Sequence, residues 1–173
     1  MLLGILSDTH DNPEFLKKAI ETFRKKKIGL AIHCGDWASP TIPRFYLKQK
    51  PAWKTLSVFG NNDGDRYRFL TYCNLESWNI EFFDEILEIE LDGKKIAAYH
   101  GSSEAITDAL VRCEKYDLVL TGHTHKPLIE QKGKTLHVNP GFLNPLGDHK
   151  DYEKASVAVY DTETGKAELV WLN

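Results

Sequence analysis

The 173-residue chain has only three cysteines, Cys34, Cys73 and Cys113, and none of them forms a C-x-x-C pair. Three widely spaced cysteines are typical of reduced thiols, in the core or near the surface, and not of a disulfide framework. We therefore expect a cytoplasmic protein whose fold is held by its apolar core.

The chain also lacks a long apolar run and a surplus of basic residues. No apolar stretch approaches the ~18 residues that cross a bilayer, so no membrane partner is expected. A strand-like run follows Met1 with no basic segment before it, so no signal peptide is expected. The net charge is -3, and tight binding of nucleic acid, which a broad basic face would support, is not expected.

The remaining composition is ordinary for a globular protein, with 42% hydrophobic and 27% charged residues. We expect a single domain over residues 1–173. A chain of this length buries roughly two thirds of the surface that it exposes when unfolded.

The first half of the chain alternates strand-like and helix-like segments. A helix is predicted after the N-cap Asn12, with Pro13 at its first position and Gly29 able to end it. A shorter helix is predicted over 43–48, and residues 65–76 are expected to be partly helical. Short apolar runs predict buried strands over 2–6, 29–34 and 55–59. This order implies a parallel sheet with right-handed crossovers.

The second half changes to hairpins, of which the Asp92-Gly93 turn is the strongest signal. A helix is predicted near 104–114. Strands are predicted over 86–91, 95–99, 118–120, 128–131, 135–138, 156–160 and 167–172. The expected architecture is an α/β fold, a two-sheet α/β sandwich with flanking helices.

Five short polar clusters follow predicted strands. They are Asp8-Thr9-His10, Gly35-Asp36, Gly60-Asn61-Asn62-Asp63, His100-Gly101 and Gly122-His123-Thr124-His125. A single Asp at a strand end is usually a turn or a cap, and a single His in a loop is usually a surface residue. Five clusters in this order are hard to obtain from turns alone. Since ligands bind beyond the carboxyl ends of the strands in doubly wound sheets, the clusters can converge on one site.

The side chains of these clusters predict two divalent transition metal ions. Asp8 and His10 stand two residues apart, as do His123 and His125, so each pair points the same way in extended chain. Asp36 has two oxygens with which to bridge two ions. Imidazole and carboxylate ligands suit Mn, Fe, Co, Ni or Zn better than Ca or Mg, and Mn is our first choice. Two ions about 3.5–4 Å apart can activate a water and clamp a phosphoryl group.

The order D-x-H, G-D, G-N-x-D, H and G-H-x-H resembles the calcineurin-like metallophosphoesterase superfamily. The short length, the G-H-T-H form and Asn139-Pro140-Gly141 are similar to the small YfcE-type phosphodiesterase subgroup. The resemblance spans residues 1 to about 160. It implies the metallophosphoesterase fold and hydrolysis of a phosphate ester, a phosphodiester before a monoester. Whether that substrate derives from a nucleotide stays open.

The resemblance also implies a role for each matched residue. Asp36 would bridge the two ions together with a water or hydroxide that attacks phosphorus, and Asn61 would also lie near the phosphate oxygens. The implied ligands are Asp8, His10, Asp36 and His125 for one ion, and Asp36, Asn61, His100 and His123 for the other.

Asn62 departs from the pattern of many larger family members, which carry His there as a candidate general acid. Asn can hydrogen-bond a phosphate oxygen but cannot donate a proton as an acid, so hydrolysis of poor leaving groups is in doubt. We still count Asn62 as a catalytic candidate with Asp36 and Asn61. Asp63 is expected to hydrogen-bond either a ligand such as His10 or the loop. Phe142 either forms an aromatic wall or packs.

The other notable residues favour structural roles. We expect Cys34, His33 and His137 to be structural and His149 to be solvated. Trp37 either lines the pocket or packs.

A rival hypothesis is a non-catalytic or dual-role scaffold, because the retromer scaffold subunit resembles the same fold with an incomplete ligand set. An exposed apolar patch away from the metal edge would favour that hypothesis. The candidates for an oligomer contact, which would make a homo-oligomer, are Trp53, Trp78, Phe82 and Phe83.

Overall fold

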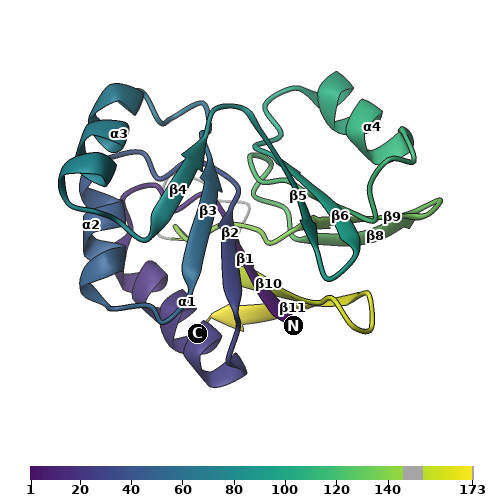
Figure 1. Ribbon diagram of the computed structural model, residues 1–173, viewed down its shortest axis with the longest axis horizontal. Helices are drawn as coiled ribbons and strands as arrows, with labels where there is room; N and C mark the ends of the chain where they lie inside the picture. The colour runs from purple at the N-terminus through teal and green to yellow at the C-terminus, as the bar shows by residue number, and fades with distance from the viewer. Residues whose placement is uncertain (146–153, 173) are drawn as a thin grey trace.

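The structure is a computed structural model that describes residues 1–145 and 154–172, so His149 lies outside the described residues. Two sheets face each other and helices lie outside them (Figure 1). The first sheet has the strand order β11-β10-β1-β2-β3-β4, and the second has the order β5-β6-β7-β9-β8. The predicted two-sheet α/β sandwich with flanking helices is confirmed.

The strands and helices have the following bounds. The first sheet contains β1 (Leu2–Leu6), β2 (Leu30–His33), β3 (Lys54–Val58), β4 (Ile80–Phe83), β10 (Ala155–Asp161) and β11 (Lys166–Leu172). The second contains β5 (Ile86–Leu91), β6 (Lys94–Tyr99), β7 (Leu118–Leu120), β8 (Leu128–Lys132) and β9 (Thr135–Asn139). The helices are α1 (Pro13–Lys26), α2 (Thr41–Lys48), α3 (Arg66–Leu75) and α4 (Glu104–Arg112).

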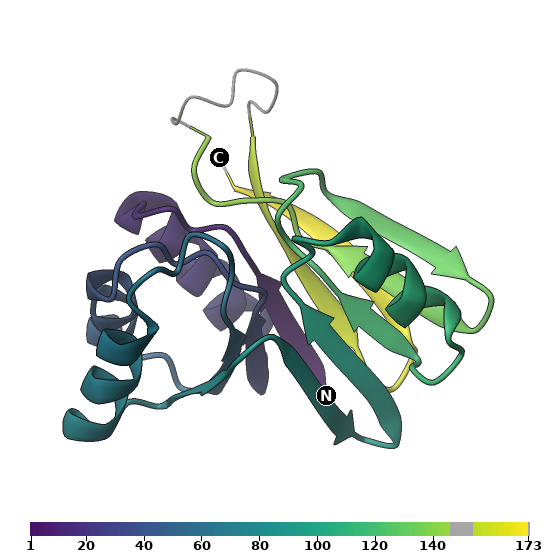
Figure 2. The same cartoon turned by 90° about the horizontal axis from the view of Figure 1, so that it is seen from above.

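Each layer of the sandwich buries its own set of apolar side chains. The helices α1, α2 and α3 cover the outer face of the first sheet, and α4 covers the outer face of the second (Figure 2). Leu16 and Phe23 of α1 pack onto the first sheet, whereas Ile5 and Leu120 lie in the core between the two sheets. None of the helices in the described ranges is long and apolar enough to span a bilayer.

Strands β1 to β4 are parallel to their neighbours, as the sequence predicts for the first three. Parallel pairing carries β1, β2 and β3 in the same direction, so their carboxyl ends meet at one edge. In the second sheet β6 and β7 are parallel as well. The loops that follow these strands carry the five polar clusters.

Three local predictions need correction. Helix α1 ends at Lys26 and not at Gly29, because its C-cap Lys27 takes a left-handed conformation (φ 57) and donates its N–H back to the Arg24 carbonyl. Strand β4 was not predicted, since its run of four residues is short and includes an exposed glutamate. Residues 66–75 form a complete helix, capped by Asp65.

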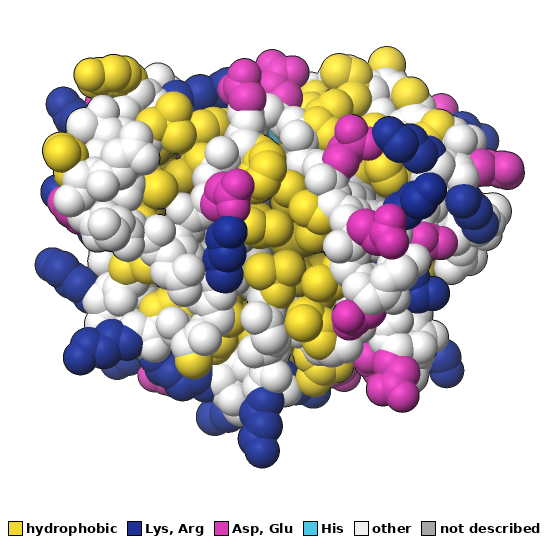
Figure 3. Space-filling model, viewed as in Figure 1, with side chains coloured by type: hydrophobic (Ala, Val, Ile, Leu, Met, Phe, Trp, Pro, Cys, Tyr) yellow, Lys and Arg dark blue, Asp and Glu magenta, His cyan; other side chains and the backbone are white. Residues whose placement is uncertain are grey.

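The prediction that Trp53 is a candidate for an oligomer contact is wrong, because its side chain is only 4% exposed and packs in the core beneath the helices. Trp78 and Phe82 are half-buried against the same core, and Phe83 is half-buried against the core between the sheets. Apolar side chains form a band where the seam between the two sheets opens on one face (Figure 3). Partly buried side chains that border the inter-sheet core are Leu30, Phe83, Ile89 and Leu91.

A buried hydrogen-bond chain ties α2 to β3. The Tyr46 hydroxyl lies 2.7 Å from Thr55 Oγ1 and accepts a hydrogen bond of 2.7 Å from Trp53 Nε1. Burial raises the pKa of Tyr46 to about 12, so the hydroxyl stays protonated.

Replacing Tyr46 with Phe should lower the free energy of unfolding by about 2 kcal/mol, because the Trp53 N–H loses its acceptor inside the core. Urea unfolding followed by tryptophan fluorescence measures the change. Tyr67→Phe is the control, since Tyr67 is 82% exposed and should shift the value by less than about 0.5 kcal/mol. Equal effects of the two changes would contradict this assignment.

Candidate metal centre

Five of the seven predicted ligands take the left-handed backbone conformation. They are Asp8 (φ 53), His10 (φ 43), Asp36 (φ 63), His123 (φ 64) and His125 (φ 60). Non-glycine residues adopt it at a cost, and such strain gathers at functional sites. The prediction that each D-x-H and H-x-H pair converges through extended chain is therefore wrong. These side chains meet because the loops turn sharply just beyond the strands.

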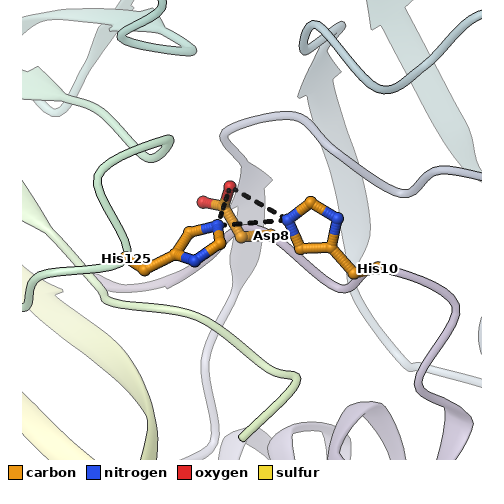
Figure 4. A group of neighbouring side chains, drawn as sticks. All are labelled: Asp8, His10 and His125. Carbon is orange, nitrogen blue, oxygen red and sulfur yellow. Dashed lines mark hydrogen bonds and ion pairs between the residues drawn. The ribbon is translucent and has the colours of Figure 1, made fainter. Parts of the chain in front are cut away.

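The first group of side chains joins the loop after β1 to the loop after β7 (Figure 4). Asp8 Oδ1 lies 3.6 Å from His10 Nε2 and 3.2 Å from His125 Nε2. The two imidazole nitrogens are 3.1 Å apart. Ligands that sit about 2.0–2.2 Å from one metal ion lie roughly 3.0–3.5 Å from each other. The spacing of these three atoms fits a shared cation.

The second group surrounds Asp36. Its Oδ2 lies 3.3 Å from His100 Nε2, and His100 Nε2 lies 3.0 Å from Asn61 Oδ1. The same Asp36 oxygen is 3.7 Å from His10 Nε2. Asp36 therefore faces both groups, as a bridging ligand must.

His123 stands apart from the other six predicted ligands. Its side chain is exposed, and its ring meets His100 edge to face with the centroids 5.1 Å apart. Its backbone N–H donates to Asp8 Oδ2 at 3.0 Å. The structure thus places His123 at the rim, next to the second group.

The Asp8 carboxylate is tied down on one side only. Its Oδ2 accepts hydrogen bonds from Ser7 Oγ at 2.5 Å and from the His123 N–H. Its Oδ1 is buried, accepts no hydrogen bond from the described residues and faces the nitrogens of His10 and His125. A buried anionic oxygen without a donor is costly, and a cation would satisfy it.

The electrostatics of the site favour added positive charge. Burial alone would raise the pKa of Asp8, but the imidazoles of His10, His125 and His100 hold it well below its usual range. Burial alone would lower the pKa of His100, but Asp36 and Asp8 raise it above its ordinary value. The two carboxylates thus raise the pKa of the His10 and His100 imidazoles, as an anionic pocket does to cationic groups beside it.

Asp63 holds the loops, and among the described residues its carboxylate hydrogen-bonds to no predicted ligand side chain. Its carboxylate accepts the backbone N–H groups of Asp36 at 2.9 Å, Ala38 at 2.9 Å and Gly60 at 2.8 Å. The loop alternative is therefore correct, and the His10 alternative is not. Hydrogen bonds from three backbone groups fix the position of the Asp36 backbone.

His100 is oriented by the main chain of the first sheet. Its Nδ1 lies 2.8 Å from the carbonyl oxygen of Cys34, which can only accept, so Nδ1 carries a proton. In the neutral ring the Nε2 lone pair then points toward Asp36 and Asn61. Cys34 itself is fully buried, as predicted, and burial raises the pKa of its thiol.

Asn62 clamps Asp36 from the solvent side. Its Nδ2 donates to Asp36 Oδ2 at 2.7 Å, and its backbone N–H donates to Asp36 Oδ1 at 2.8 Å. Both carboxylate oxygens of Asp36 therefore have defined positions.

Two aromatic side chains stack on histidines at the site. Phe142 is fully buried and lies parallel to the His125 ring, with centroids 5.1 Å apart. It therefore packs and forms an aromatic wall at the same time. Trp37 is fully buried, stacks on His33 at 3.7 Å and donates from Nε1 to Ser57, so it packs and does not line an open pocket.

Sequence reasoning gave no role to Ser7 and used Asn139 only as a mark of the subgroup. Asn139 Nδ2 donates to the carbonyl of Gly122 at 2.7 Å and to Thr124 Oγ1 at 3.1 Å, which anchors the loop of His123 and His125. The Asn139-Pro140-Gly141 signal could have identified this anchor.

Known proteins are similar to this chain over most of its length. The profile of the calcineurin-like phosphoesterase superfamily domain matches residues 1–165. Phosphodiesterase MJ0936 of Methanocaldococcus jannaschii is 33% identical over 146 residues, which cover 82% of this chain and 83% of that protein. Phosphodiesterase YfcE of Escherichia coli (strain K12) is 24% identical over 156 residues, which cover 83% and 80%.

Two solved structures show how widely the fold is shared. A novel archaeal phosphodiesterase superposes with a TM-score of 0.89 at 27% identity, over 99% of this chain and 100% of that one. Vps29 of Entamoeba histolytica, solved in complex with Zn²⁺, superposes with a TM-score of 0.68 at 18% identity, over 100% of both chains. The second similarity shows the fold alone.

Gly60→Ala should lower the free energy of unfolding by about 2 kcal/mol, because overpacking a filled site forces the backbone to move. An added Cβ would lie 2.6 Å from the Asp36 backbone nitrogen and closer still to its Oδ1. Gly64→Ala is the matched control, since nothing lies within 4 Å of its Cβ position. Chemical denaturation compares the two, and equal stabilities would show that the Asp36 loop yields freely.

His33 should make the metal-free protein less stable in mild acid. Burial lowers its pKa from 6.5 to about 3, so below pH 6.5 the unfolded chain binds a proton that the folded chain refuses. This stability is present above pH 6.5 and is lost as the pH falls, by about 2 kcal/mol at pH 5.

The His33→Gln variant removes that titration. We expect its unfolding free energy, measured with urea in a chelator, to fall about 2 kcal/mol less than wild type between pH 7.5 and pH 5. His10 and His100 titrate in both proteins and cancel in the comparison. Parallel pH dependences would show that His33 accepts a proton in the folded state.

Proposed function

Because the chain belongs to the calcineurin-like phosphoesterase superfamily, we propose that it is a phosphodiesterase that depends on two divalent transition metal ions. One observation carries the proposal: Asp36 Oδ2 lies 3.7 Å from His10 Nε2 on one side and 3.3 Å from His100 Nε2 on the other. A single carboxylate oxygen thus faces two groups of potential ligands.

The residues present fit such ions. Asp8 Oδ1 is a buried oxygen that accepts no hydrogen bond from the described residues, and the donors around it are imidazole nitrogens. We assign Asp8, His10, Asp36 and His125 to one ion, and Asp36, Asn61, His100 and His123 to the other. This donor set favours Mn, then Ni, Fe, Co or Zn. When bound, two such ions supply charge to polarise a phosphoryl oxygen and lower the pKa of an attacking water.

The side chains of the protein have positioning roles in this reaction. Asn62 holds both oxygens of Asp36 and presents an amide donor at the mouth of the site, where it can hydrogen-bond a phosphate oxygen. Asn61 lies beside it and is also exposed. Neither amide can protonate a departing alkoxide, so diesters with acidic leaving alcohols should be the better substrates.

The proposal also covers the cellular location of the protein and the class of its substrate. We place the protein in the cytoplasm because its three cysteines are free in the structure. The substrate is a phosphate ester.

A protein-interaction role is the second candidate. It is favoured by the apolar band at the seam between the sheets (Figure 3). The band would suit a partner protein or a second copy of the chain. It does not exclude catalysis, since it is built from different residues than the candidate metal centre.

Hydrolysis of a chromogenic phosphodiester and its monoester tests the proposal. Metal-stripped protein is refilled with Mn, Ni, Zn or Mg. We expect turnover that needs metal, with the diester preferred. Asp36→Asn and His123→Ala should each lower kcat/KM at least about 100-fold, because even residues that only orient metal ligands cost 10–100-fold when replaced.

Asp108→Asn is the control, since Asp108 lies on α4, is exposed and pairs only with Arg112 among the described residues. Its kcat/KM should match wild type. Absence of turnover with every metal, while calorimetry shows that metal binds, would overturn the proposed enzymatic function. The protein-interaction role would then be the remaining candidate.

A further inference from the structure

His33 is an imidazole buried within the first sheet. It is the last residue of β2 and is fully buried, as are Ala31, Ile32 and Cys34 beside it in the chain. Burial lowers the pKa of His33 to about 3, so the ring is neutral at pH 7. A polar ring in such a place costs stability unless both of its nitrogens are hydrogen-bonded. A buried imidazole among apolar neighbours therefore calls for a functional explanation.

The two ring nitrogens of His33 have partners that fix its tautomer. Nδ1 accepts the backbone N–H of Gly35 at 3.1 Å. Because a backbone N–H can only donate, Nδ1 carries the lone pair and the proton of the neutral ring sits on Nε2. Nε2 lies 2.8 Å from Thr9 Oγ1, so the ring donates to the Thr9 hydroxyl. Both nitrogens are thus satisfied, and the other tautomer would lose the bond to Gly35.

These two hydrogen bonds join two loops of the candidate metal centre. Thr9 directly precedes His10 in the loop after β1, and Gly35 directly precedes Asp36 in the loop after β2. The backbone N–H groups of Thr9 and His10 also donate to the Asp36 carbonyl, at 2.8 and 3.2 Å. The 3.7 Å distance from Asp36 Oδ2 to His10 Nε2 spans the same two loops. His33 therefore lies where it can influence the spacing of two predicted ligands.

The two loops need contacts of this kind to keep their shape. Asp8 (φ 53), His10 (φ 43) and Asp36 (φ 63) all take the left-handed backbone conformation. This conformation costs free energy and persists only where the surroundings impose it. A loop that relaxed would carry its ligand away from the shared position. The hydrogen bonds of His33 oppose such relaxation, because they hold the residue between Asp8 and His10 and the residue before Asp36.

Trp37 restricts the movement of the His33 ring. The two rings are stacked, with centroids 3.7 Å apart and an angle of 12° between their planes. Trp37 is itself anchored, since its Nε1 donates to Ser57 Oγ on β3 at 2.8 Å. Stacking fixes the plane of the imidazole, and the hydrogen bonds to Thr9 and Gly35 fix its rotation within that plane. The ring is therefore preorganised, as a group that supports metal ligands must be.

We propose that His33 is a positioning residue of the candidate metal centre, which holds the ligands His10 and Asp36 at their working distance through Thr9 and Gly35. The proposal rests on the metal-dependent function proposed above, in which His10 and Asp36 bind an ion together. A purely structural His33 would support the stability of the protein without affecting its affinity for metal. Metal binding measured beside stability therefore distinguishes the two roles.

Thr9→Val tests the link, because valine has nearly the shape of threonine and cannot accept the Nε2 proton. Metal-free protein is titrated with Mn²⁺ in a calorimeter. The affinity should be about tenfold lower than that of wild type, since removal of a group that supports metal ligands typically costs roughly 10–100-fold. Electron paramagnetic resonance should show coupled Mn²⁺ ions in wild type and a larger share of isolated ions in Thr9→Val.

Thr135→Val is the matched control. Thr135 is also fully buried, and its Oγ1 donates to the Tyr116 carbonyl at 2.8 Å. It begins β9 at the edge opposite to the metal centre, since β9 runs parallel to β7 and the loop of His123 follows β7. Thr135→Val should therefore lose stability and still bind Mn²⁺ with wild-type affinity. Equal losses of Mn²⁺ affinity in the two variants would trace them to general destabilisation and overturn the positioning role.

Two measurements on the protein in a chelator need neither a metal nor turnover. Nitrogen-15 magnetic resonance should find the His33 proton on Nε2, and a proton on Nδ1 would overturn the proposal. Exchange of the Thr9 and His10 amide protons should be about tenfold faster in Thr9→Val, because the loss of a buried hydrogen bond favours local opening. Thr135→Val should keep the wild-type exchange of these two protons.

His33→Gln and His33→Leu complete the test. A glutamine amide can still donate to Thr9, so His33→Gln should retain more of the Mn²⁺ affinity than His33→Leu. Equal affinity in Thr9→Val and wild type, with unchanged amide exchange, would overturn the positioning role and leave the phosphodiesterase standing. Absence of Mn²⁺ binding by wild type would instead count against the proposed function, and the exchange of the Thr9 and His10 protons would still show whether His33 holds the loop.

Discussion

The buried carboxylate of Asp36 is the constraint on which the candidate site depends. A charge inside a protein must be compensated. Here amide donors and imidazoles compensate it, and a second carboxylate holds the backbone. Asn62 donates to both oxygens, and the imidazoles of His10 and His100 face Oδ2. Asp63 fixes the backbone behind it. Gly60 must be a glycine, because a side chain there would occupy the space of this carboxylate.

The two sheets contribute different halves of the site. The first sheet supplies both carboxylates, one imidazole and the amides, from the loops after β1, β2 and β3. The second supplies three imidazoles, from the loops after β6 and β7. Parallel pairing explains why residues so distant in sequence reach one edge. The packing of the sheets against each other then determines the distance from anion to imidazole.

Much of the fold could be predicted from the sequence, because strand periodicity and hairpin turns are local signals. The polar clusters at strand ends identified the side chains that converge. The left-handed conformations of Asp8, His10 and Asp36 were not accessible, since tertiary contacts impose them against local preference. The role of Asp63 was predicted only as one of two alternatives and that of Asn139 was not predicted, because each acts largely through backbone groups of another loop. Strand β4 is too short to give a periodic signal, and only its pairing with β3 defines it. The single domain and the metal-ligand roles stay predictions.

The pairing of Asp8 with His125 has a consequence for the mechanics of the molecule. Asp8 belongs to the first sheet and His125 to the second, and their side chains meet at 3.2 Å. A cation bound between them would cross-link the two sheets, so the sheets could not separate without releasing the ion. By linkage, a higher affinity for the ion would then give the protein a higher thermal stability. Removal of the ion by a chelator would then destabilise the packing of the two sheets as well as the loops of the site.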